Sequence, residues 1–179
     1  MGRSEKDQIR CMAMTKLGNG LYHAGHHEDA SSVYQAQLSM LRRLRAAPGR
    51  HMLILQGNIA NTYDALGRHQ DSMRMSQEVY AGWLKLRGEE HENTLMAAQN
   101  YAASLVRLER FEEAKALHRK MIPVARRVLG TIHKYTLGMS LNYARALYRA
   151  DGATLDDLRE AVTTLEEIER TARRVLGGA

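Results

Sequence analysis

The chain has 179 residues, enough for one sizeable domain, and 44% of them are apolar while 26% are charged, which excludes disorder of the whole chain. One cysteine and no long apolar run exclude an internal disulfide, a membrane-spanning helix and a secretory leader, so we expect a cytoplasmic protein. The net charge is +6, but residues 151–179 hold seven acids and four arginines and carry −3, so residues 1–150 carry +9. This balance points to an anionic partner.

Helices are favoured throughout, because Ala, Leu, Met and Arg are plentiful, aromatic residues make up 6% and proline occurs twice. Apolar periodicity and Gly-containing turns predict helices over residues 5–23, 28–44, 51–66, 71–86, 94–108, 111–129 and 135–150, and a last apolar stripe from 155 to 175. Pro48 and Gly49 mark the turn after the second helix. Pro123 predicts a bend inside one helix and not a break between two.

A spacing of 42 residues relates the successive helix pairs. It links Gly88, His91, Thr94, Leu95, Asn100, Tyr101 and Ala102 to Gly130, His133, Thr136, Leu137, Asn142, Tyr143 and Ala144. A fixed period of this size is typical of a repeat array. We therefore predict an all-α fold of about four helix-turn-helix repeats within one domain, 1–179, with repeats at about 5–46, 47–88, 89–130 and 131–179. In the last repeat, five extra residues precede the small residue Ala161.

Small residues recur where the second helix of each repeat approaches the first, at Ala30, Ser72 and Ala114. Each hairpin has an apolar face too wide to bury alone, and stacking on the next hairpin covers it. A large side chain at 114 should force that pair apart and cost about 1–3 kcal/mol. The last repeat has no polar capping helix after it, which leaves its outer face for a second copy or for a longer array.

These motifs together resemble tetratricopeptide repeats of the long, kinesin-light-chain type. The shared elements are the Leu129-Gly130, His133 and Thr136 turn, the Asn142-Tyr143-Ala144 triplet, and a turn with an acid before a small residue, as in Asp71-Ser72. The resemblance covers roughly residues 10–179. It implies a right-handed superhelical solenoid in which the first helix of each repeat lines a concave groove that holds an extended peptide. It also implies an adaptor or scaffold with no catalytic activity and no cofactor.

The resemblance maps three columns of groove residues onto the chain. The first contains Lys16, Asn58, Asn100 and Asn142; the second contains Asn19, Asn61, Ala103 and Arg145; the third contains His23, Ala65, Arg107 and Arg149. Asparagine offers a donor and an acceptor to the backbone of an extended peptide, and the arginines and Lys16 would select acidic side chains or a terminal carboxylate. The asparagines could instead bond one helix to the next.

Other functions are less favoured by the sequence. His23, His26 and His27 lie together at a helix end with no second cluster, which favours a solvated turn over a metal site. Cys11 has no histidine near it in sequence and no serine lies in a nucleophile elbow, so we expect no enzymatic activity. The alternatives that remain are a basic helical repeat that binds RNA and a self-assembling piece of a longer array.

Overall fold

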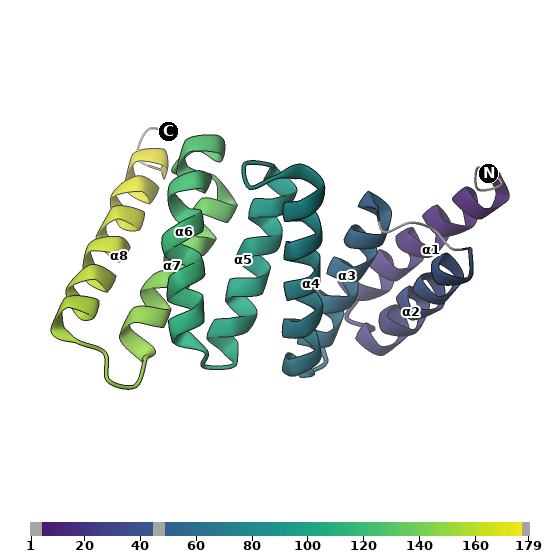
Figure 1. Cartoon of the computed structure of the whole chain (residues 1–179), viewed down its shortest axis with the longest axis horizontal. Helices are drawn as coiled ribbons and strands as arrows, with labels where there is room; N and C mark the ends of the chain where they lie inside the picture. The colour runs from purple at the N-terminus through teal and green to yellow at the C-terminus, as the bar shows by residue number, and fades with distance from the viewer. Residues whose placement is uncertain (1–4, 45–48, 177–179) are drawn as a thin grey trace. The chain divides into compact units, whose positions relative to one another are not determined.

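The structure, a computed structural model, describes residues 5–44 and 49–176, and within these ranges the chain forms eight α-helices and no strand (Figure 1). The helices are α1 (Glu5–His23), α2 (His27–Arg43), α3 (Arg50–Ala65), α4 (His69–Arg87), α5 (Glu92–Arg107), α6 (Phe111–Leu129), α7 (Lys134–Arg149) and α8 (Leu155–Leu176). The all-α prediction is confirmed. Each predicted helix is present, with bounds that agree to within two residues.

The chain divides into two compact units, the first ending at Leu86 and the second beginning at Arg87. Unit 1 contains α1 to α4 and unit 2 contains α5 to α8, so each unit holds two helix pairs. The division lies close to the boundary predicted between residues 88 and 89. The boundary predicted between residues 46 and 47, and the turn at Pro48, lie outside the described residues.

The turn inside a repeat has the same backbone geometry in three repeats, although its sequence changes. Gly25 and Gly67 have φ of 84° and 74°, in the left-handed region that glycine adopts without strain. Glu109 occupies the equivalent place with φ of 59°. At each of the three, the backbone N–H bonds to a carbonyl three residues back, and the next N–H bonds five residues back. This is the geometry of a helix end closed by a left-handed residue.

The turn between repeats is closed by the recurring histidine. The Nδ1 atom of His91 accepts a hydrogen bond from the backbone N–H of Asn93 at 3.1 Å, and that of His133 accepts one from Tyr135 at 3.4 Å. Each histidine therefore caps the helix that follows it. The Thr94 hydroxyl donates to the Gly88 carbonyl at 2.7 Å, which joins the start of α5 to the turn before it.

The core of unit 1 forms around Tyr34, which is 2% exposed on α2. It packs with Ala30, Leu38, Leu41, Leu55 and Ile59. A Cβ at Gly18 would overlap the Tyr34 ring, so α1 and α2 approach each other where no side chain intervenes. Trp83, on α4, is 1% exposed. Burying side chains of this size stabilises the fold by about 1.5–3 kcal/mol each before conformational entropy is counted.

In unit 2 the predicted small positions are in the core. Ala114 is fully buried on α6 and Ala161 is 3% exposed on α8, so the insertion before α8 does not change which residue meets the neighbouring helix. The insertion forms a turn with Gly152 at φ of 79°. At its end, the Thr154 hydroxyl accepts the Asp157 backbone N–H while the Asp157 carboxylate accepts the Thr154 N–H, both at 3.1 Å. This reciprocal pair caps α8.

The helix α6 continues without interruption through Pro123, as predicted. The side chains on either side of the proline are buried, and Ile122 and Val124 are each 8% exposed. Packing of these neighbours offsets the backbone bond that proline removes, which costs about 3 kcal/mol in an isolated helix. One long helix therefore covers the centre of unit 2.

Candidate functional site

In unit 1 the predicted groove residues lie on α1 and α3, which contact each other. The structure brings two of them together, because the side-chain amide of Asn58 donates to Oδ1 of Asn19 at 3.2 Å. The same oxygen accepts the Tyr34 hydroxyl at 2.6 Å. One acceptor thus links three helices, and the two asparagines take part in packing as well as facing the surface.

Two hollows adjoin these residues in unit 1. The smaller, of about 150 Å³, is lined by Asn19, Asn58 and Asn61 together with Tyr22, His23 and Tyr34. The larger, of about 450 Å³, lies among α1, α2 and α3, and its walls are mainly apolar, with Met12, Leu41, Ile54 and Leu55. Lys16, which is exposed, is at its edge. Unit 1 therefore places its groove residues beside spaces that could hold a side chain.

In unit 2 the equivalent asparagines, Asn100 and Asn142, lie on α5 and α7, which also contact each other. A Cβ at Gly138, one turn before Asn142, would lie 3.0 Å from the Gln99 amide, so the two helices approach closely here. Both asparagines are half-buried. No side-chain hydrogen bond of either is found within residues 5–44 and 49–176. Their amides differ in this respect from those of Asn19 and Asn58.

Three arginines follow these asparagines toward the ends of α5 and α7, and all three are exposed. Arg145 and Arg149 lie three and seven residues after Asn142, on the same face of α7. The Arg149 guanidinium lies 3.5 Å from the Glu109 carboxylate and 6.0 Å from the centre of the Phe111 ring. Arg107 occupies the last turn of α5. The surface of α5 and α7 is thus polar at its centre and cationic at one end.

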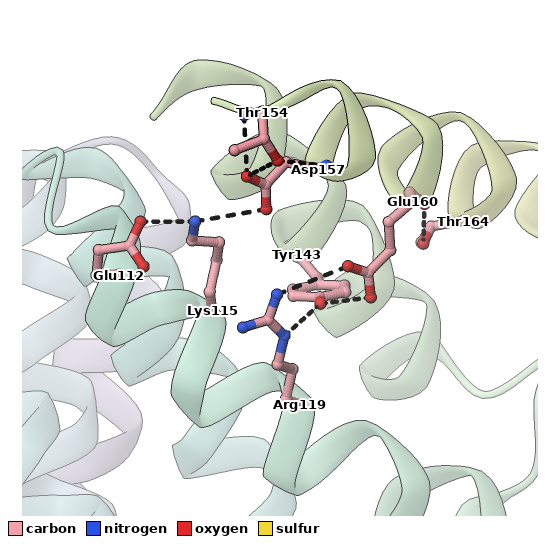
Figure 2. Close-up of polar contacts among 8 residues, drawn as sticks. All are labelled: Glu112, Lys115, Arg119, Tyr143, Thr154, Asp157, Glu160 and Thr164. Atoms are coloured by element: carbon pink, nitrogen blue, oxygen red, sulfur yellow. Dashed lines mark hydrogen bonds and ion pairs between the residues drawn. The ribbon is translucent and has the colours of Figure 1, made fainter. Parts of the chain in front are cut away.

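A polar network that the sequence did not predict joins α6, α7 and α8 (Figure 2). The Tyr143 hydroxyl donates to Glu160 at 2.6 Å and accepts from Arg119 at 2.8 Å. Burial, together with the Glu160 hydrogen bond, raises the pKa of Tyr143 to about 12, so it stays protonated. From the sequence, Tyr143 is recognised only as a member of the recurring Asn142-Tyr143-Ala144 triplet. In the structure it is also the centre of an ion-pair network.

A second part of this network holds the start of α8. The Lys115 ammonium, on a side chain only 7% exposed, lies 2.6 Å from Glu112 and 3.7 Å from Asp157 (Figure 2). Hydrogen bonds from Thr154 and the nearby Lys115 lower the pKa of Asp157. The signal for this arrangement was present in the sequence, because the basic residues at 115, 119 and 126 are four and seven residues apart and the acids at 157, 160 and 167 are three and seven apart, so each set lies on one helix face. These residues can be recognised as partners only once α6 and α8 are known to lie side by side.

The comparisons with known proteins agree with this architecture. A family model described as the tetratricopeptide repeat matches residues 51–127. A crystal structure of the nearly identical TPR-like repeats of a Podosopora anserina kinesin light chain superimposes with a TM-score of 0.77 at 21% identity, covering 96% of this chain and 78% of that one. Residues 51–127 thus match the tetratricopeptide repeat, and the chain has the fold of a tetratricopeptide repeat array.

Two further solved structures have the same repeat fold as this chain. BtubC (BKLC) from P. vanneervenii has a TM-score of 0.64 at 17% identity and covers 97% of this chain and 85% of its own. PlcR from Bacillus thuringiensis, crystallised with the peptide PapR7 and DNA, has a TM-score of 0.51 at 16% identity and covers 94% and 69%. At these identities the likeness establishes the fold. No curated protein matches the chain.

Tetratricopeptide repeats generally mediate protein–protein interaction and are typically non-catalytic. In the described part of this repeat protein, no three His, Cys, Asp or Glu side chains are grouped so that they could hold a metal ion. The Tyr22 ring instead packs against the rings of His23 and His27, at 5.6 and 5.1 Å between centres. None of the helices described is long and apolar enough to span a membrane.

Proposed function

We propose that the chain is a non-catalytic adaptor or scaffold module that binds an extended, acidic segment of a partner protein on the first helices of its repeats. The residues proposed to bind it are Lys16, Asn19, Asn58, Asn61, Asn100, Arg107, Asn142, Arg145 and Arg149. A cytoplasmic location is part of the proposal. It agrees with the free thiol of the single cysteine, Cys11, because thiols stay reduced in that compartment.

The observation that carries the proposal is the pair of half-buried asparagines on α5 and α7. An extended peptide presents backbone N–H and C=O groups that need partners, and each asparagine amide can donate and accept. Asn100 and Asn142 have no side-chain partner within the described residues, so they can bind a peptide without breaking an internal bond. Both amides are only half-buried, so a bound peptide backbone would replace water as their hydrogen-bond partner.

The charge of the surface favours an acidic peptide. Arg145 and Arg149 follow Asn142 on one face of α7, and Arg107 ends the neighbouring helix. Arg149 lies near the carboxylate of Glu109, and about half or more of each of these two side chains is exposed. Such an exposed ion pair contributes only about 0–1 kcal/mol to the stability of the fold. A carboxylate of the ligand can therefore replace Glu109 beside Arg149. The PlcR structure, which contains a peptide, shows that a protein with this fold can bind one.

The test is binding of fluorescein-labelled peptides, each with several Asp or Glu residues, compared with peptides in which Asn and Gln replace the acids. Replacing Asn100 and Asn142 together by Ala should weaken binding of the acidic peptides by at least about tenfold, because two bidentate contacts are lost. The control Arg159→Gln removes an exposed arginine that pairs with Asp156 on α8. It should bind like the unchanged chain.

Three outcomes would contradict the proposal. The asparagine variant could bind as well as the control, or its helix content could fall, which would assign the asparagines to folding. A labelled single-stranded RNA could also bind more tightly than the peptides. RNA binding would show the steep loss with salt that release of counterions from phosphates produces, with a slope of about −0.7 per phosphate contacted.

A second candidate function is self-association through α8. This helix exposes an apolar stripe in which side chains are between 39% and 62% exposed, comprising Leu155, Leu158, Val162, Leu165 and Val175. Its first turn contains acids and its last turn contains Arg173 and Arg174. Two copies packed antiparallel would bury the stripes and pair acidic ends with basic ends. Sedimentation across a dilution series should then show a dimer that Val162→Glu abolishes, and a monomer at every concentration would exclude it.

A further inference from the structure

A cleft of about 360 Å³ lies in unit 2 where α8 packs beside α6 and α7, apart from the residues proposed to bind peptide. Its polar wall is formed by three arginines and by hydroxyl groups, namely Arg126, Arg170, Arg174, Thr131, Thr136 and Ser140. The cleft contains one acidic side chain, Glu167. Guanidinium groups only donate hydrogen bonds and each hydroxyl group can donate one, so this wall suits an oxygen-rich anion.

The arginines are only partly neutralised. Arg126 donates to Glu167 at 2.8 Å, and this pair accounts for the one carboxylate of the cleft. Arg170 reaches a backbone carbonyl, that of Glu166, at 3.4 Å. Arg174 is exposed and has no acidic partner within residues 5–44 and 49–176. Three positive charges against one negative charge leave a surplus of two in the cleft.

A buried hydroxyl supplies a second, independent indication of a ligand. Thr136 is 1% exposed, and its Oγ1 has no hydrogen-bond partner in the described part of the chain. The equivalent threonine, Thr94, donates to the Gly88 carbonyl at 2.7 Å. A buried hydroxyl without a partner is unfavourable, so a ligand that accepts its hydrogen bond is favoured. Ser140, one turn further along α7 and 3% exposed, lines the same wall.

We propose that this cleft binds a phosphate group as a dianion. A phosphate carries a charge of about −1.5 to −2 near neutral pH and three acceptor oxygens, which match the surplus of two charges and the several donors. A carboxylate has one charge and two oxygens, so it would leave a guanidinium and a hydroxyl unsatisfied. The phosphate can be the free inorganic ion or a phosphorylated side chain of a protein. The two share the group that the cleft contacts.

The experiment is calorimetric titration of the full chain with sodium phosphate in a chloride buffer. Arg174→Gln should weaken binding by at least about tenfold, because it removes a hydrogen bond between a guanidinium and the charged phosphate. Thr136→Val, which keeps the shape of the side chain, should weaken it several-fold without lowering the thermal midpoint. Glu167→Gln should tighten binding, since it removes the carboxylate that competes for Arg126.

The matched control is Arg173→Gln, which changes the neighbouring residue of the same helix. Arg173 pairs with Glu169 at 2.6 Å and is not part of the cleft wall, so phosphate binding should be unchanged. If the Arg173 and Arg174 variants weaken binding equally, the effect comes from the lower net charge and not from the cleft, and the proposal is overturned. Absence of binding to the unchanged chain, or binding that Thr136→Val leaves intact, would overturn it too.

A second arm distinguishes the two sources of the phosphate. A short phosphoserine peptide and its unphosphorylated form are titrated under the same conditions. Tighter binding of the phosphopeptide than of inorganic phosphate, lost in the unphosphorylated form and in Arg174→Gln, assigns the cleft to a phosphorylated protein. Equal affinity for phosphate and phosphopeptide assigns it to the free ion. Neither result depends on Asn100 or Asn142, so this proposal can fail while the peptide-binding proposal stands.

Discussion

Unit 1 and unit 2 place different residues at equivalent positions of the 42-residue pattern. Residue 34 of the first repeat corresponds to residue 118 of the third, so Tyr34 in unit 1 is replaced by His118 in unit 2. The Tyr34 hydroxyl finds Asn19 on the paired helix at 2.6 Å. The equivalent of Asn19 is Ala103, and Nε2 of His118 has no hydrogen-bond partner in the described residues. A buried polar group is satisfied only where the paired helix supplies its partner.

Side-chain size shows the same dependence on the paired helix. Gly18 lies against the Tyr34 ring, whereas the third repeat has Ala102 at the position equivalent to Gly18 and the smaller ring of His118 at the position equivalent to Tyr34. The residue at one of these two positions therefore changes together with the residue that it contacts on the paired helix. A consensus taken column by column would combine a large ring with an alanine and create a clash.

The largest expected effect concerns the pH dependence of unit 2. Burial lowers the pKa of His118 from 6.5 to about 4. The folded chain therefore binds fewer protons than the unfolded chain between these values. The free energy of unfolding should be highest above pH 6.5 and should fall by about 3 kcal/mol as the pH drops to 4.

His118→Leu should remove most of this fall in the free energy of unfolding between pH 6.5 and 4. Urea unfolding followed by circular dichroism at a series of pH values measures it. His26→Ala, at an exposed turn of unit 1, serves as the control and should keep the slope. Fluorescence of Trp83, which is buried in unit 1, separates the two units in the same titration. An unchanged slope in His118→Leu would show that carboxylates, and not this histidine, set the acid stability.

The second largest effect tests whether the small residue Gly18 is required by the large ring of Tyr34 in unit 1. Gly18→Ala should lower the free energy of unfolding by about 1–3 kcal/mol, because the added methyl group overlaps Tyr34. Adding Tyr34→Ser, which copies Ser76 of the second repeat, should reduce the cost of the alanine. Gly20→Ala, with open space around its Cβ, should instead stabilise the helix by up to about 1 kcal/mol. Urea unfolding of the unchanged chain, Gly18→Ala, Tyr34→Ser and the double variant closes the cycle, and additive effects would refute the pairing.

The smallest effect concerns the turns. Glu109 has φ of 59°, which costs a residue with a side chain about 1–2 kcal/mol, whereas Gly67 takes the equivalent conformation of unit 1 without that cost. Glu109→Gly should therefore raise the unfolding free energy by about 1 kcal/mol, even though it removes an exposed ion pair with Arg149. The reverse change, Gly67→Glu, should lower it by a similar amount. Thermal midpoints that move the other way would show that the ion pair outweighs the backbone strain.

The helices were predictable from the sequence because each is marked by its own residues. The bounds of α1 and α6 agree with the prediction at both ends, since glycine turns and apolar periodicity are local signals. The helix α4 begins two residues before the predicted Asp71. The Asp71 carboxylate bonds to Arg68 and Arg74 inside the first turn, which also lowers its pKa, so it does not mark the start of the helix.

The site was less predictable because it depends on contacts between helices. The sequence placed Asn58 and Asn100 in one column, yet Asn58 bonds to Asn19 whereas Asn100 has no side-chain partner in the residues described. The pattern also places an asparagine, Asn61, at the position equivalent to Asn19, so periodicity alone does not tell which asparagine of the column forms a side-chain bond. The assignment of the column to peptide binding stays a prediction. The phosphate cleft was not predicted either, because Thr136 and Arg174 lie far apart in sequence and meet only when α8 packs on α7.

The turn before α8 has a practical consequence. Five extra residues enter there, and Ala161 still reaches the core, because helix packing and the Thr154 cap fix α8 independently of the turn. Asp151 and Gly152 are exposed at its tip. A peptide tag or a fluorescent label inserted between them should be accommodated, which offers a handle for imaging the protein without altering either end of the chain.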